Sequence, residues 1–352
     1  MKWISYSFLI LIFLSNQAQA REWFELYNNS RTTAMGGVKI AVSSDDSTVF
    51  RNPSGLGSLR GSYINYLDPE LETSSAFVNE FSNSGTELEK IKILLNTNRD
   101  KYYHAKTQIT PSYSSRNFSV GLIYNNEVSA IMNTAGTALD AIYHSDIGLM
   151  LGYNYSFFDG RFKLGLTARY LDRVELDNAA IDPLTTIDLT NSGSSGTAFS
   201  GDLGLTLQAP VIYLPTLAVV VHDLADTKFT SSAARLKTAT LPKDIKQSVD
   251  VGISLSPIQS KHLRSQFSVE YRDLTNSRTD DFINKRLHAG IEINWEDIFY
   301  LRLGSNQNYL TAGFEIAAER LSWQISTYGE EVGTKISPLE DRRFSTRIAV
   351  RF

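Results

Sequence analysis

The chain has 352 residues, a formal net charge of −4 at pH 7 with both signs mixed along it, and no cysteine. The lack of cysteine excludes a disulfide framework and a lipid anchor on a cysteine, and the charge offers no basic surface for nucleic acid. After the first 20 residues no run of about 18 apolar residues occurs, so membrane-spanning helices are excluded too.

Residues 1–20 have the pattern of a secretory signal peptide. Lys2 is their only charged residue, an apolar run covers residues 4–14, and the small-residue sequence Ala18, Gln19, Ala20 suits a cleavage site. The apolar run is too short to cross a bilayer. We therefore expect the chain to be exported and the mature protein to begin at residue 21.

Residues 31–57 form a polar stretch punctuated by glycine, RTTAMGGVKIAVSSDDSTVFRNPSGLG. Paired glycines permit a tight turn, paired aspartates accept hydrogen bonds from nearby N–H groups, and an Asn-Pro pair begins a turn. Such a stretch is stable only inside a larger structure, or it is an ordinary loop leading into a soluble β domain. Its candidate functional residues are Gly36, Gly37, Asp45, Asp46, Asn52 and Pro53.

The order AMGG, a short apolar strand, SSDDSTVFRNPSGL and an aromatic strand resembles the start of the FadL-type family. Residues 63–74, YINYLDPELETS, resemble the long first strand of that family, although Ser54 stands where the family usually has alanine after Asn-Pro. The resemblance implies an outer-membrane transporter of fatty acids and other hydrophobic compounds. It also implies a plug at residues 21–60 inside a transmembrane β-barrel formed by residues 61–352.

Period-two alternation is the strongest physical signal after residue 60. In the last strand Phe344, Ile348 and Phe352 share one face, while Arg343 and Arg347 share the other, where lipid is excluded. The 18 Phe and 17 Tyr suit the aromatic girdles of a barrel. A soluble sandwich would alternate similarly. A terminal phenylalanine also resembles the signal read by the barrel-assembly machinery, which makes that machinery a predicted partner through Phe352.

Connection lengths predict the number of strands, because outer-membrane barrels have short periplasmic turns and longer outer loops. Working back from the C-terminus, short turns fall at residues 319–320, 296–297, 256–261, 209–214, 159–160 and 114–115. Longer connections fall at residues 329–341, 275–284, 224–246, 176–197, 133–140 and 82–102, with a short outer loop at 305–308. If residues 61–80 form one strand broken at Pro69, the result is an all-β, 14-stranded antiparallel transmembrane barrel in the bacterial outer membrane.

The face opposite the lipid carries charges of both signs, which predicts a wet or salt-bridged lumen in which the plug aspartates pair with arginines. Such a lumen argues against an oily channel along the whole axis. The principal lumen charges are Arg161, Arg169, Arg286, Glu292, Arg302, Arg343 and Arg347.

One outer loop contains a helical signal at residues 84–96. Ser84 followed by Glu87 fits a capping box, and Leu88, Ile91 and Leu95 share one face. The helix is either a lid packed on the barrel mouth or an apolar groove that first receives a ligand, and the two roles are compatible.

No constellation for catalysis is visible, and we predict no enzyme, no cofactor and no metal site. The five histidines are scattered, and no HExxH pair, GxSxG elbow or phosphate-binding loop occurs. His288 is expected to make a structural hydrogen bond.

Two functions remain, apart from a weaker hydrolase hypothesis. The first is uptake or passage of small hydrophobic or amphiphilic compounds, with outer-membrane lipid and a hydrophobic small molecule as partners and plug movement at Gly36, Gly37, Asn52 and Pro53. The alternative is a barrel that binds a protein partner, as secretion-associated members of the resembling family do.

Overall fold

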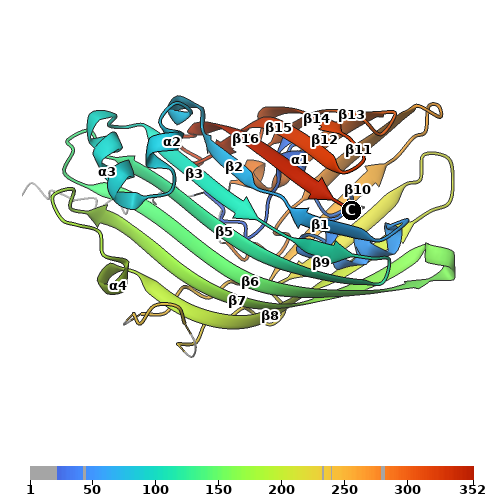
Figure 1. Cartoon of the computed structure of the whole chain (residues 1–352), viewed down its shortest axis with the longest axis horizontal. Helices are drawn as coiled ribbons and strands as arrows, with labels where there is room; N and C mark the ends of the chain where they lie inside the picture. Colours follow the sequence, from blue (N-terminus) through green and yellow to red (C-terminus); the bar gives the residue numbers. More distant parts are fainter. Residues whose placement is uncertain (1–21, 43–44, 232–233, 239, 279–281) are drawn as a thin grey trace, which may run out of the picture.

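The computed structural model describes residues 22–42, 45–231, 234–238, 240–278 and 282–352, so that the predicted signal peptide lies outside the described residues. Sixteen strand segments form one antiparallel sheet that closes into a barrel (Figure 1). The segments are β1 (Tyr63–Leu67), β2 (Glu70–Ser74), β3 (Tyr102–Ile109), β4 (Ser112–Ser114), β5 (Phe118–Met132), β6 (Leu139–Phe157), β7 (Phe162–Ile181), β8 (Ser194–Gln208), β9 (Thr216–His222), β10 (Ser248–Leu255), β11 (Leu263–Tyr271), β12 (Leu287–Trp295), β13 (Phe299–Asn306), β14 (Tyr309–Ala317), β15 (Leu321–Glu331) and β16 (Glu340–Arg351).

Helical segments are short and lie in the connections and in the N-terminal part. The α-helices are α1 (Ser30–Ala34), α2 (Phe81–Ser84), α3 (Leu88–Thr97) and α4 (Leu189–Ser192). The 3₁₀ segments are η1 (Thr48–Phe50), η2 (Pro53–Ser58), η3 (Ser75–Phe77), η4 (Phe158–Gly160) and η5 (Ile283–Arg286). No helix among the described residues has the length and apolar character needed to cross a membrane.

Two strands of the wall are each divided into two segments. β1 and β2 both pair with β16, and β3 and β4 both pair with β5. The sixteen segments therefore occupy fourteen positions, and the predicted 14-stranded barrel is confirmed.

The two divisions lie side by side, because β1 pairs with β4 and β2 pairs with β3. Each contains a proline, which has no N–H for the ladder. The first, at Pro69, was predicted from the sequence, whereas the second, at Pro111, was not. The Asp68 carboxylate joins them: it accepts hydrogen bonds from the Thr110 N–H at 2.6 Å and from the Thr110 hydroxyl at 2.5 Å.

The two faces of the wall agree with the predicted alternation. In β16, Phe344 and Ile348 are 48% and 47% exposed, whereas Arg343 and Arg347 are buried. A closed barrel with an apolar outer surface is the form in which strands cross a bilayer, because it leaves no backbone group unpaired. The predicted location in the bacterial outer membrane is confirmed at the level of this fold.

Two boundaries differ from expectation. The loop predicted at residues 176–197 is shorter, because β7 continues to Ile181 and β8 begins at Ser194, as the long strands in Figure 1 show. The helix predicted at residues 84–96 is found as α3, which begins at Leu88, whereas Ser84 is the last residue of the separate helix α2, which ends before Gly85 with its φ of +48°. The Ser84 side chain makes no capping hydrogen bond, so the predicted capping box is wrong.

Candidate functional site inside the barrel

The N-terminal segment, residues 22–42 and 45–59, packs against the inward-facing side of the wall. Its helix α1 contacts β13, β14, β15 and β16, while η1 and η2 contact β5, β6, β7 and β8. Most of its residues are buried. In Figure 1 this blue segment lies among the strands, and the chain then continues into β1.

Glycine allows the segment to approach the wall backbone around Gly36. The φ values of Gly36 and Gly37 are +69° and +86°, a region that side chains disfavour. A Cβ at Gly36 would lie 2.2 Å from the Ala289 carbonyl oxygen, and one at Gly290 would lie 2.1 Å from the Met35 carbonyl oxygen. These glycines therefore provide close packing between segment and wall.

The Asn-Pro turn is fitted to the wall in the same way. Asn52 caps η2 by accepting the Ser54 N–H at 3.0 Å, and its amide donates to the Ile40 carbonyl at 2.9 Å. The hydroxyl of Ser54 lies 2.6 Å from the Thr206 hydroxyl on β8. A serine in place of the family's alanine therefore has a polar partner on the wall. A Cβ at Gly165 would lie 2.2 Å from the backbone of Pro53.

The two plug aspartates have different partners. Asp45 pairs with Arg31 at 2.5 Å and with Arg51, both in its own segment. Asp46 faces the wall, where Arg347 and Arg351 approach its carboxylate at 3.5 and 3.8 Å. The sequence could not distinguish these roles, because adjacent residues in an irregular loop can point in any direction.

Most of the predicted lumen charges take part in ion pairs across neighbouring strands. Arg302 lies between Glu292 at 2.6 Å and Glu315 at 2.5 Å, and Glu292 also pairs with Arg31 of the N-terminal segment at 2.9 Å. Buried charges in this arrangement are compensated, but removing one partner would leave another buried and alone. This network therefore ties α1 to the wall.

The remaining lumen charges lie in separate places. Arg169 pairs with Asp202 and Asp223, Arg343 with Glu22 and Asp341, and Arg347 with Asp68, while Arg286 contacts Asn276 and lies near the Trp23 ring. Arg161 is exposed in the turn after η4, so the structure does not place it in the lumen.

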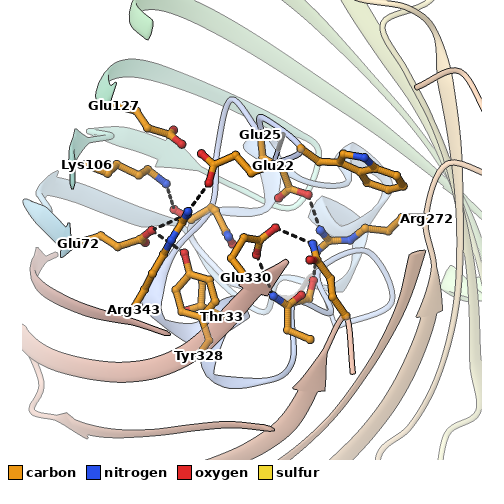
Figure 2. Close-up of a pocket in the computed structure, with 15 residues that line it drawn as sticks. Glu22, Glu25, Thr33, Glu72, Lys106, Glu127, Arg272, Tyr328, Glu330 and Arg343 are labelled. Carbon is orange, nitrogen blue, oxygen red and sulfur yellow. Dashed lines mark hydrogen bonds and ion pairs between the residues drawn. The ribbon is translucent and has the colours of Figure 1, made fainter. Parts of the chain in front are cut away.

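A small charged cavity of about 40 Å³ lies between the N-terminal segment and the wall (Figure 2). Glu25 and Arg272 meet on one side of it. Burial raises the pKa of Glu25, but the charges of Arg272 and Lys39 outweigh burial and lower that pKa to about 2. Polar and charged groups dominate its lining: Glu22, Glu25, Glu72, Lys106, Glu127, Arg272, Glu330 and Arg343.

Three histidines have partners that sequence spacing does not reveal. His104 lies 2.8 Å from Glu72 and 2.9 Å from Ser129, and His222 lies between Asp202 and Asp250. The sequence expectation for His288 was a structural hydrogen bond, and its Nδ1 lies 2.9 Å from the Gly36 carbonyl oxygen. Partners on adjacent strands could be found only after the register is known.

The predicted ligand-receiving helix is packed on the barrel mouth. Leu88, Ile91 and Leu95 are 8%, 1% and 0% exposed and belong to a buried apolar cluster, here called the apolar cap. The other buried members of the apolar cap are Phe77, Tyr103, Ala105, Val128, Ala130, Met132, Leu139, Ala141, Leu176 and Ile181. The apolar face predicted from the sequence exists, but it is already filled by the wall.

An apolar groove of about 580 Å³ lies on the outer surface beside β2. Phe81 lines this groove and also packs against the apolar cap, so it connects the two. Other side chains of the groove are Leu71, Val78, Leu301, Phe314, Ile325 and Phe344.

No protein-family model matches the chain, and no curated protein matches its sequence. Its fold is similar to that of the Ralstonia pickettii toluene transporter TbuX, with a TM-score of 0.56 and 12% identity over 92% of this chain and 98% of that chain. It is also similar to the deltaS2 mutant of the monoaromatic hydrocarbon channel TodX, with a TM-score of 0.54 and 10% identity over 93% and 98% of the two chains. The fold expected from the resemblance is thereby confirmed.

Proposed function

We propose that this protein is an outer-membrane barrel that passes small hydrophobic or amphiphilic compounds. The apolar cap carries the proposal. It is larger than the other buried apolar clusters among the described residues, and it lies at the end of the barrel that bears the long loops. A compound that replaces part of this packing would gain about 25 cal/mol per Å² of apolar surface removed from water.

The proposed path leads from the apolar cap to the groove on the outer surface. Phe81 lines the groove and packs against the apolar cap, and α2, which contains it, is only four residues long. A short helix joined through Gly85 can rearrange without disturbing the strand ladder. The fold likeness to a toluene transporter and to a monoaromatic hydrocarbon channel supports the same class of cargo here.

In this proposal residues 21–60 act as a plug and residues 61–352 as the barrel. The support is the burial of the N-terminal segment and its ion pairs with the wall through Arg31 and Asp46. The close packing at Gly36 and Asn52 favours a plug that remains seated while compounds pass above it.

Uptake of labelled toluene, other aromatic hydrocarbons and fatty acids into a deletion strain carrying plasmid-borne variants tests this function. Ile91→Asp should abolish uptake, because Ile91 is 1% exposed within the apolar cap. Ile93→Asp is the matched control, because Ile93 lies on the same helix and is 68% exposed, and it should transport as the parent protein does. Heat-modified mobility on gels shows that each barrel has assembled.

Uptake that is the same with and without the protein, across the whole panel, would refute the transport proposal. The alternative function would then stand, in which the long-loop end binds a protein partner. Leu184 and Ile336 favour that alternative, because they are 93% and 96% exposed in two of the long loops. Native mass spectrometry of the protein taken from its own membrane would show whether a lipid-like ligand or a second protein accompanies it.

A further inference from the structure

Glu127 of β5 is a buried acid with no direct partner. Its residue is 8% exposed, and its carboxylate points into the charged cavity (Figure 2). Among the described residues it makes no hydrogen bond or ion pair, and its cross-strand neighbour Lys106 instead donates to the Asn28 carbonyl at 3.4 Å. A buried ionised carboxylate is costly without a compensating group, so Glu127 is either protonated or paired with a cation that is not part of the described chain.

Two further ligand atoms lie beside this carboxylate. Ligand atoms of Glu22, His104 and Glu127 all lie within 4.8 Å of one another. The Nδ1 atom of His104 is 3.7 Å from Glu22 Oε1. The three residues come from the N-terminal segment, β3 and β5, so no sequence motif joins them or predicts a metal site here.

The surroundings orient the histidine for metal binding. Glu72 Oε1 lies 2.8 Å from His104 Nε2, and the tautomer in which Nε2–H donates to this carboxylate leaves the lone pair of Nδ1 available to a metal. A carboxylate behind a histidine is the usual outer-shell arrangement of metal sites. Ser129 lies 2.8 Å from Glu22 Oε1 and 2.9 Å from His104 Nδ1, and its hydroxyl can donate to the Glu22 carboxylate.

The local charge also leaves room for a cation. Arg343 is shared among Glu22, Asp341 and Glu72, with its closest approach to Glu72 at 3.8 Å. It holds the Oε2 atom of Glu22, while Oε1 of the same carboxylate remains on the side of His104. One guanidinium therefore serves several acids, and it does not reach Glu127 in an ion pair.

We propose that Glu22, His104 and Glu127 bind one Zn²⁺ ion, with water as the fourth ligand. An imidazole nitrogen and two carboxylate oxygens suit zinc, whereas calcium and magnesium prefer oxygen ligands alone. Ligands about 2.1 Å from a tetrahedral ion lie about 3.4 Å apart, so small side-chain movements would close the site. The cavity of about 40 Å³ has the space for a water.

The ion would join the N-terminal segment to the wall at a point where Glu22 already contacts Arg343 and Ser129. This site is independent of the proposed transport path, since neither His104 nor Glu127 belongs to the apolar cap or to the outer groove.

Zinc binding to the full-length protein in detergent, stripped with EDTA and measured by calorimetry and by metal analysis after dialysis, tests the site. The parent protein of this experiment and all variants made from it carry His262→Ala, because His262 and Glu296 form an exposed pair at 3.2 Å that could hold zinc weakly. The parent should bind one zinc per chain, and cobalt in its place should give the visible absorption of a tetrahedral site. Glu127→Gln should weaken binding at least about 100-fold, since loss of an outer-shell partner alone costs about 10- to 100-fold.

Glu330→Gln is the matched control. Glu330 lines the same cavity but is held by Asn306 and Gln307, so this variant should bind zinc as the parent does. His104→Asn provides a second ligand variant should Glu127→Gln fail to assemble. Absence of stoichiometric zinc in the parent, or equal affinity in the parent and an assembled ligand variant, would overturn the proposal.

Discussion

Replacing Gly165 by alanine should displace the N-terminal segment while leaving the barrel closed. The new Cβ would lie 2.2 Å from the Pro53 carbonyl carbon and 2.2 Å from the Ser54 nitrogen, which are both backbone atoms. Since non-bonded atoms of this size pack at about 3.5 Å, the segment must move by about 1.3 Å. Overpacking of this kind costs about 1 to 3 kcal/mol, and most of the cost should fall on the seating of the segment.

Thiol protection measures this displacement directly. Ser54 is fully buried, so a cysteine placed there should react slowly with a maleimide in the refolded protein. If the roughly 1 to 3 kcal/mol of overpacking makes local opening of the segment easier by the same free energy, Gly165→Ala should raise the rate of the thiol reaction about 5- to 150-fold, because 1.4 kcal/mol corresponds to a factor of ten. Gly61→Ala is the control, because a Cβ at Gly61 has no atom within 4 Å. Equal protection in both variants would show that the packing of Pro53 against the wall does not hold the segment.

Two more predictions concern the outer face and acid. Ile348→Arg should cost about 2 to 4 kcal/mol in bilayer unfolding, because Ile348 faces lipid, whereas Leu184→Arg in an outer loop should cost less than about 0.5 kcal/mol; equal costs would contradict the assigned register. Burial raises the pKa of Glu25, but Arg272 and Lys39 lower that pKa overall to about 2. Because the pKa of Glu25 in the unfolded chain is about 4.3, the contribution of Glu25 to stability is complete above about pH 5 and is lost as the pH falls toward 2. Trp23 fluorescence should follow this loss, and Glu25→Gln should remove it; identical acid profiles would refute the assignment.

The barrel could be predicted from sequence because its signals are local. Alternation places Ile348 and Arg347 on opposite faces whatever their neighbours are, and Pro69 breaks a strand through its own missing N–H. Pro111 gives the same local signal and could have been recognised. The contact that joins the two breaks could not be predicted, because the Thr110 N–H finds its partner, Asp68, on a neighbouring strand.

For the interior, the sequence could predict that charged residues would be paired, but not which residues pair. Composition indicated that arginines such as Arg302 and Arg347 would be paired in the lumen, but register and loop conformation decide which acid each one meets. Arg161 shows the limit: its alternation is correct, yet it lies beyond the strand end, in a turn where the face has no meaning. The cluster of Glu22, His104 and Glu127 likewise exists only because three distant segments meet.

The same interior contacts bear on how a compound could pass. A path along the axis would have to separate Arg31 of the segment from Glu292 of the wall, and separating a buried charge from its partner costs about 3 to 5 kcal/mol. A path from the apolar cap to the outer groove disturbs only apolar packing around Phe81. We therefore expect Gly165→Ala, which acts on the segment alone, to transport as the parent protein does, and loss of uptake in that variant would favour the axial path.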